Sequence, residues 1–242
     1  MELPDAQTQP IAFLREAIRQ RRTILISGGT STGKTTFLNA MLGEIPREER
    51  VVLVEDTPEL KFPGANSVGL VAVKGELGEA KVTANELLQA ALRLRPDRIV
   101  LGELRGAESV SFLRAINTGH PGSFSTIHAN SLRGALEQLS LMVMQTGIGL
   151  TRSDTIAYAA SVIDVIVQLG RDANGKRGIT QVILAGMAAN LCVESHLRDL
   201  VEQGFEVVGS RRCEAEIHWF CSLFRFVVRI QVENQIHLEV GF

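Results

Sequence analysis

The sequence has 242 residues and a mass of 26.4 kDa, with 45% hydrophobic and 21% charged residues. These proportions are typical of a folded globular protein and exclude disordered, collagen-like and coiled-coil chains. The net charge of -2 excludes an overall basic surface for binding nucleic acid or an anionic membrane. Apolar stretches stay short of the roughly 18 residues of a membrane span, and the amino terminus lacks the features of a signal peptide. All three cysteines lie in the last third, which argues against a disulfide framework, so we expect a cytoplasmic protein.

Helical and strand patterns alternate through the first 165 residues. In chain order, the sequence predicts a helix at 11–22, a strand at 23–27, a helix ending at 42, a strand at 50–56, an edge strand or hairpin arm at 67–74, a helix opened by a capping box at 83–86, a strand at 98–104, a helix at 106–117, a strand at 123–128, helices at 131–145 and 153–163, and strands at 165–169 and 178–184. The last two strands are joined by Asn174-Gly175, the strongest hairpin signal in the chain. This order predicts an α/β fold, with a mostly parallel sheet flanked by helices on both faces.

A glycine-rich motif lies between the first predicted strand and the helix that follows it. Residues 28–35 satisfy the pattern G-x-x-x-x-G-K-[ST], whose backbone amides cradle nucleotide phosphates. In such a loop Lys34 reaches the β- and γ-phosphates, Thr35 supplies a hydroxyl to Mg²⁺, and the helix N-terminus adds its dipole. The alternative is an ordinary glycine-rich connector, which the strand before and the helix after disfavour. The candidate nucleotide-binding residues are Gly28, Gly29, Thr30, Ser31, Thr32, Gly33, Lys34, Thr35 and Thr36.

Acidic residues end two of the apolar strands. Glu103 lies where P-loop enzymes place a carboxylate that orders Mg²⁺ or polarises the attacking water. Glu55 and Asp56 end another strand in the same way, and the carboxyl ends of parallel strands open on one crevice. A general base among these two and a structural role for both are open alternatives. For Glu103 the alternative is a carboxylate that simply faces solvent.

Four segments resemble, in order, the Walker A, Asp, Walker B and His boxes of the secretion traffic ATPases. They are Gly28–Thr36, Val54–Asp56, Leu94–Arg105 and Thr118–Asn130. This family includes the motors of type II secretion, type IV pili, and type IV secretion or conjugation. The His-Pro-Gly-Ser sequence at 120–123 and the segment 165–170 most resemble the type IV secretion and conjugation branch. The resemblance covers about residues 11–184.

The resemblance implies a RecA-like P-loop core that binds ATP and Mg²⁺ and assembles as a homo-oligomer, a hexameric ring. It also implies partners among secretion-channel proteins at the inner membrane, and a cytoplasmic location peripheral to that membrane. By the same resemblance, Glu103 and Glu55 are candidate water-activating or metal-ordering acids, Thr35 and Glu103 are the candidate metal ligands, and His128 is the candidate γ-phosphate sensor. His120 is expected to brace the His box. Candidates for an arginine that acts across the ring are Arg93, Arg95, Arg105, Arg114 and Arg133.

Two features depart from the family. A separate domain precedes the ATPase core in the family, whereas about ten residues precede the first predicted helix here, so we expect that domain to be absent. Residues 182–208 instead resemble the nucleophile region of isochorismatase-like cysteine hydrolases, with Cys192 in the nucleophile position. Those enzymes also need an Asp and a Lys from their own fold, so an inert cysteine is the preferred interpretation. We therefore predict an ATPase domain at 1–184 and a divergent segment at 185–242.

The sequence thus predicts Mg²⁺-dependent ATP hydrolysis that powers type IV secretion or conjugative transfer of protein or DNA. The alternative within the family is a type IV pilus or type II secretion motor. The alternatives outside it are a nucleotide-binding scaffold without hydrolysis and a cysteine hydrolase using Cys192. A nucleic-acid translocase is less favoured, because the sequence has no basic strip interleaved with aromatic residues.

Overall fold

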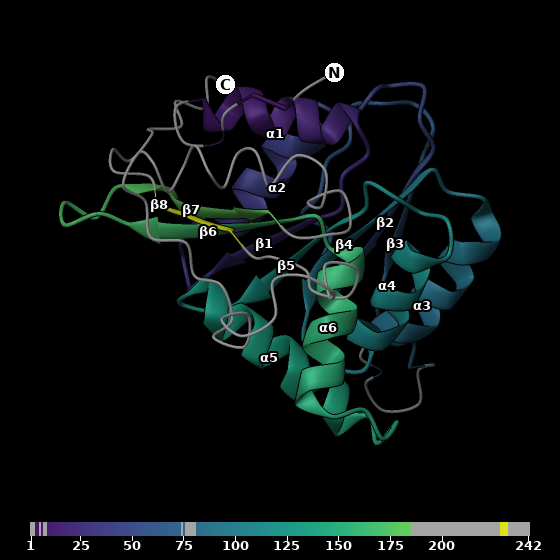
Figure 1. Ribbon diagram of the computed structural model, residues 1–242. Coiled ribbons are helices and arrows are strands. Elements are labelled where there is room, and N and C mark those ends of the chain that lie inside the picture. The colour runs from purple at the N-terminus through teal and green to yellow at the C-terminus, as the bar shows by residue number, and fades with distance from the viewer. Residues whose placement is uncertain are drawn as a thin grey trace, which may run out of the picture.

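The computed structural model describes residues 3–4, 6, 9–73, 75, 81–184 and 228–231. Figure 1 shows its elements, which are α1 Pro10–Arg19, β1 Ile24–Gly28, α2 Lys34–Leu42, β2 Val51–Glu55, β3 Ser67–Val71, α3 Ala84–Ala91, β4 Arg98–Leu104, α4 Glu108–Asn117, β5 Phe124–His128, α5 Leu132–Gln145, α6 Arg152–Val162, β6 Val165–Arg171, β7 Arg177–Leu184 and β8 Val228–Gln231. Each predicted helix and strand is confirmed. The predictions for Cys192 and for the rest of 185–227 lie outside the described residues.

Local side-chain chemistry explains where several helices begin and end. The Thr83 side chain accepts the backbone N–H of Glu86, whose carboxylate accepts the Thr83 N–H, so the predicted capping box opens α3. The first helix ends at Arg19 rather than at residue 22, because Arg21 adopts a left-handed φ of 56° and the Arg22 N–H turns back to the Ala17 carbonyl.

Eight strands form one sheet in the order β3-β2-β4-β5-β1-β6-β7-β8. The first six are parallel to their neighbours, which confirms the predicted mostly parallel sheet. The segment 67–74, which the sequence left as an edge strand or a hairpin arm, supplies the edge strand β3. At the other side β6, β7 and β8 run antiparallel, and Gly175 takes the positive φ of 79° that the predicted hairpin turn requires.

Helices cover both faces of the sheet and build two apolar cores. In Figure 1, α1 and α2 lie on one face and α3 to α6 on the other. Phe13, Leu38 and Ile26 are fully or almost fully buried in the first core, and Leu88 and Phe112 in the second. The central strands are buried on both faces, as expected for parallel strands between two helical layers. Among the described residues, no helix is both long and apolar enough to cross a membrane.

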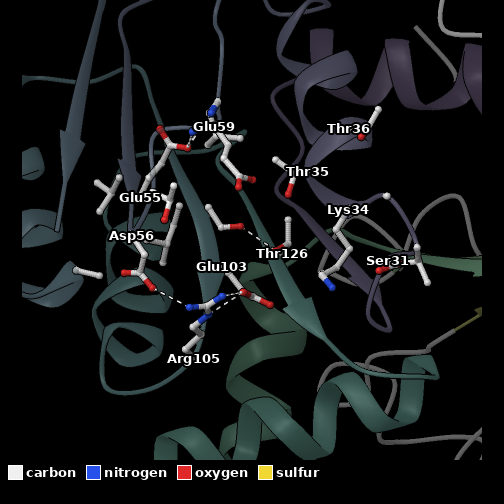
Figure 2. Close-up of a pocket in the computed structure, with 18 of the residues that line it drawn as sticks. Ser31, Lys34, Thr35, Thr36, Glu55, Asp56, Glu59, Glu103, Arg105 and Thr126 are labelled. Atoms are coloured by element: carbon white, nitrogen blue, oxygen red, sulfur yellow. Dashed lines mark hydrogen bonds and ion pairs between the residues drawn. The ribbon is translucent and has the colours of Figure 1, made fainter. Parts of the chain in front are cut away.

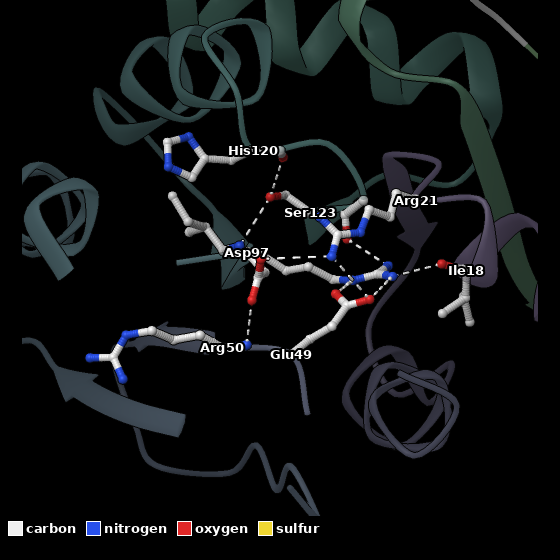
Figure 3. Close-up of polar contacts among 10 residues, drawn as sticks. Ile18, Arg21, Glu49, Arg50, Asp97, His120 and Ser123 are labelled. Atoms are coloured by element: carbon white, nitrogen blue, oxygen red, sulfur yellow. Dashed lines mark hydrogen bonds and ion pairs between the residues drawn. The ribbon is translucent and has the colours of Figure 1, made fainter. Parts of the chain in front are cut away.

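A buried ion pair fastens the amino-terminal edge of the sheet (Figure 3). Arg98, the first residue of β4, is fully buried, and its Nε and Nη2 donate to the carboxylate of Glu49 at 2.6 and 3.1 Å. The same guanidinium donates to the carbonyls of Ile18 at 2.8 Å and Gly122 at 3.2 Å. Arg98 therefore joins the end of α1, the turn before β2 and the turn before β5 at the edge opposite the P-loop.

Candidate active site

The glycine-rich loop connects the central strand β1 to α2, as predicted. Gly33 caps α2 with a φ of 91°, so the first turn of the helix faces the loop with free backbone amides. At Gly29 a Cβ would lie 2.6 Å from the Oδ1 atom of Asn130, so a larger residue here would displace the Asn130 side chain. Such a loop at a helix N-terminus forms an anion-binding cradle.

Lys34 lies in this loop with its ammonium group close to the backbone. Its Nζ donates to the carbonyls of Gly28 at 2.9 Å and Gly29 at 3.2 Å. Burial lowers the pKa of Lys34, while the negative charge of Glu103 opposes this shift. The lysine is therefore a partly desolvated cation, and an arriving phosphate would gain from the weaker screening around it.

Carboxylates from β4 and from the end of β2 lie opposite the loop (Figure 2). Glu103 and Asp56 are joined by Arg105, whose Nη2 lies 2.6 Å from Glu103 Oε2 and whose Nη1 lies 3.0 Å from Asp56 Oδ2. The hydrogen bond to Glu103 raises the pKa of Arg105, so this guanidinium stays charged. Arg105, one of the arginines considered for action across a ring, is thus placed within the site of its own chain.

Glu55 and Glu59 take different positions in this site. Glu55 is buried, and its Oε1 accepts the backbone N–H groups of Glu59 at 2.8 Å and Leu60 at 2.7 Å. The Glu55 carboxylate therefore fixes the turn after β2. Figure 2 shows the Glu59 carboxylate pointing into the pocket on the side of Thr35. No sequence pattern identifies Glu59, because it lies four residues beyond Glu55 in a turn without a periodic pattern.

These side chains surround a cavity of about 360 Å³, a suitable size for a small-molecule ligand. Of the predicted residues, those that line it are Ser31, Thr32, Gly33, Lys34, Thr35, Thr36, Glu55 and Glu103, whereas Gly28, Gly29, Thr30 and His128 do not. Arg177 also lines it and lies beside Gly33. No sequence signal identified Arg177, because only the antiparallel return of β7 brings it to the loop.

The two histidines lie at opposite ends of β5. His128 is exposed at the carboxyl end and pairs in register with Gly28, so it adjoins the start of the P-loop. His120 precedes the strand, and its Nδ1 lies 3.1 Å from the carbonyl of Ala115 near the end of α4. The separation places His128 at the edge of the sheet that carries the loop and His120 at the other edge.

The donor set fits a Mg²⁺ ion that arrives with phosphates. Thr35 and Glu103 offer a hydroxyl and a carboxylate on opposite sides of the cavity, and Mg²⁺ typically takes one or two protein oxygens beside substrate phosphates and water. Within the described part of the chain, no group of three or more His, Cys, Asp or Glu side chains could hold a metal by itself. The loop and the acids therefore suit a metal–nucleotide complex rather than a metal held by the protein alone.

Comparison with known proteins identifies the family of this site. The profile of the Type II/IV secretion system protein family matches residues 2–217. The chain belongs to this family. It is 43% identical over 174 residues to the type IV secretion system protein VirB11 of Bartonella quintana, covering 71% of this chain and 49% of the relative. It is 47% identical over 165 residues to the type IV secretion system protein PtlH of Bordetella pertussis, covering 66% of this chain and 49% of the relative.

A solved structure supports the same assignment. The crystal structure of the VirB11 ATPase from the Brucella suis type IV secretion system, in complex with sulphate, superposes with a TM-score of 0.67 at 36% identity. The match covers 72% of this chain and 52% of that one. The fold is thus the RecA-like P-loop fold that the sequence predicted. The chain spans about half the length of the relatives it matches.

Proposed function

We propose that this chain is an ATP-hydrolysing motor module of a type IV secretion or conjugation machine. The observation that carries the proposal is the cavity in which Lys34 and Thr35 of the P-loop lie opposite Glu103. The 43% and 47% identity to two type IV secretion proteins also supports the proposal. A type IV pilus or type II secretion motor would use the same site, and the identity to type IV secretion proteins favours the first function.

In the proposed mechanism the P-loop binds and orients the triphosphate. The amides at the start of α2 and the ammonium of Lys34 hold the phosphate oxygens, so that the γ-phosphate points toward the acids. Thr35 and Glu103 would hold Mg²⁺, which when bound neutralises charge on the β- and γ-phosphates. Water attacks the γ-phosphorus in line with the leaving oxygen, and fixed positive groups stabilise the charge that spreads over the phosphoryl oxygens.

We assign the acids by how their carboxylates are engaged. Glu55 already accepts two backbone N–H groups, so we propose that it positions the turn that carries Glu59. Glu59 and Glu103 then face the phosphates, Glu59 to orient the attacking water and Glu103 to order the metal. His128, next to the loop start in register, is proposed to sense the γ-phosphate. His120 is proposed to brace the turn before β5 through its contact with Ala115.

We further propose a hexameric ring that acts with secretion-channel proteins at the cytoplasmic side of the inner membrane. Relatives named as type IV secretion components support this placement. We also propose that residues 1–184 form the ATPase domain and that residues 185–242 form a divergent segment. Sedimentation of the protein with and without ATP would test the ring.

Two substitutions test hydrolysis. Lys34→Ala removes the phosphate-binding cation and is expected to abolish tight binding of a fluorescent ATP analogue. Glu103→Gln keeps the size of the side chain and is expected to retain binding but lose phosphate release. Arg19→Gln, at the exposed last residue of α1, is the matched control and should behave like the wild type in both assays. Unchanged hydrolysis in both site variants would remove the catalytic assignment.

The principal alternative is a scaffold that binds nucleotide without hydrolysing it. A wild-type protein that binds the ATP analogue but releases no phosphate, as a monomer and as an assembled ring, would favour this alternative. The cysteine hydrolase alternative has a separate test. Slow labelling of Cys192 by a thiol reagent would argue against a nucleophilic thiolate.

A further inference from the structure

Arg105 bridges two acids of the proposed site, Glu103 and Asp56. A metal ion that binds Glu103 would have to break the contact between Arg105 and Glu103. The exposed fractions of the side chains are 61% for Arg105, 35% for Asp56 and 23% for Glu103. Nε of Arg105 donates to Oε2 of Glu103 at 2.7 Å, and Nη2 forms an ion pair with the same oxygen at 2.6 Å. Figure 2 shows the guanidinium between the two carboxylates.

The bridge has an electrostatic reason in the strand pairing. β2 and β4 are parallel neighbours, with Val54 opposite Leu101, so the residues that follow lie side by side at the carboxyl edge. Asp56 and Glu103 therefore place two negative charges on adjacent strand ends. Like charges on neighbouring strand ends repel, and a cation between them relieves that repulsion.

The backbone of Arg105 is held independently of its side chain. The carboxylate of Glu108, the first residue of α4, accepts the N–H of Arg105 at 2.5 Å and the N–H of Gly106 at 2.6 Å. These bonds fix the turn between β4 and α4. The guanidinium lies at the end of a long, mostly exposed side chain, so it can leave Glu103 by rotamer changes without any change in the fold.

A guanidinium held against a carboxylate oxygen competes directly with a hard cation for that oxygen. Mg²⁺ binds through oxygen lone pairs, and Oε2 of Glu103 already accepts the Nε–H of Arg105, with the charged Nη2 2.6 Å away. We propose that Arg105, acting within its own subunit, competes with the divalent cation for Glu103 and thereby weakens metal binding until the metal–nucleotide complex displaces it. Asp56 is the second anchor that keeps the displaced guanidinium beside the phosphates. Arg105 is thus a positioning residue, and the inference rests on the proposed nucleotide site.

The test measures metal affinity rather than turnover. Mn²⁺ replaces Mg²⁺ as the probe, and its binding to the protein–ADP complex is followed by electron paramagnetic resonance. Arg105→Gln removes the competing charge and should tighten Mn²⁺ binding by roughly tenfold. Arg105→Lys keeps a charge but loses the planar guanidinium that lies against Glu103, so its Mn²⁺ affinity should lie between those of the wild type and Arg105→Gln. Arg19→Gln makes the same change in net charge at the exposed end of α1, away from the cavity, and should stay within about twofold of the wild type.

The affinity for ADP without metal, measured in a chelator, separates two kinds of failure. If the wild type binds no nucleotide, with or without metal, the proposed function fails and this inference fails with it. If the wild type binds ADP normally while Arg105→Gln leaves the Mn²⁺ affinity unchanged or weaker, only the competition by Arg105 is overturned. Tighter Mn²⁺ binding in Arg105→Gln but not in Arg19→Gln would support it.

Discussion

The ion pair between Arg98 and Glu49 should contribute far more to stability than an exposed pair of the same residue types. Arg98 is 0% exposed and the Glu49 side chain 9%, and their atoms approach to 2.6 Å. Arg98→Met preserves much of the apolar stem but removes the charge. Glu49 would then be a buried carboxylate with one remaining cation, Arg21, at 3.5 Å.

The expected loss of stability depends on which partners the groups around Arg98 retain in the variant. Breaking a buried pair by removing one partner costs about 3–5 kcal/mol, because the other charge is left buried and uncompensated. The Ile18 carbonyl keeps the N–H of Arg21 as a donor, and Arg21 still partly compensates Glu49. We therefore expect Arg98→Met to lower the free energy of unfolding by about 3 kcal/mol, a large share of the 5–15 kcal/mol that is typical of domains.

Urea unfolding followed by far-ultraviolet circular dichroism measures this loss as a shift of the midpoint. The matched control is Arg15→Met, which breaks the pair of Arg15 with Glu44 at 2.8 Å, with exposed fractions of 54% and 34%. An exposed pair contributes about 0–1 kcal/mol, so this midpoint should move little. Replacing both partners, with Arg98→Met and Glu49→Leu together, should recover much of the loss. A loss for Arg98→Met no larger than for Arg15→Met would refute the reasoning.

Three further predictions concern the loop, a helix cap and pH. Gly29→Ala places a Cβ against Asn130 and should weaken ATP-analogue binding by about twofold to tenfold, the cost of pushing the Asn130 side chain off its rotamer. Adding Asn130→Ala should restore binding relative to Asn130→Ala alone, and equal binding by Gly29→Ala and the wild type would contradict the close approach. Thr83→Ala removes a cap and should lower the free energy of unfolding by about 1 kcal/mol in the same urea assay, with an unshifted midpoint as the contrary result. Because burial lowers the pKa of Lys34, the ammonium loses its proton at a lower pH than an exposed lysine does. Affinity for the ATP analogue should therefore fall at a pH below the ordinary lysine pKa of about 10.4, and an affinity that stays constant up to that pH would argue against a protonated Lys34 as the phosphate ligand.

Local sequence signals determined most of the secondary structure. The capping box at Thr83 opens α3, the Asn174-Gly175 pair turns the hairpin, and the apolar runs at 51–54 and 99–101 form buried strands. The P-loop is equally local, because its glycines, lysine and threonine are contiguous and act largely through their own backbone. These features depend on neighbours in the chain, so a pattern in the sequence suffices to predict them.

Tertiary structure alone decided which side chains share the cavity and what each one contacts. In the sequence, Glu55 and Glu103 are both acids at the ends of strands. In the structure, the Glu55 carboxylate accepts backbone N–H groups of the following turn, and the Glu59 carboxylate points into the pocket. From the sequence, Arg105 was one of several arginines that could act across a ring. In the structure, the parallel pairing of β2 with β4 places it in ion pairs with two carboxylates of its own chain. Arg177 reached the loop only through the antiparallel return of β7. Strand order and register join residues far apart in the chain, and no local pattern encodes those contacts.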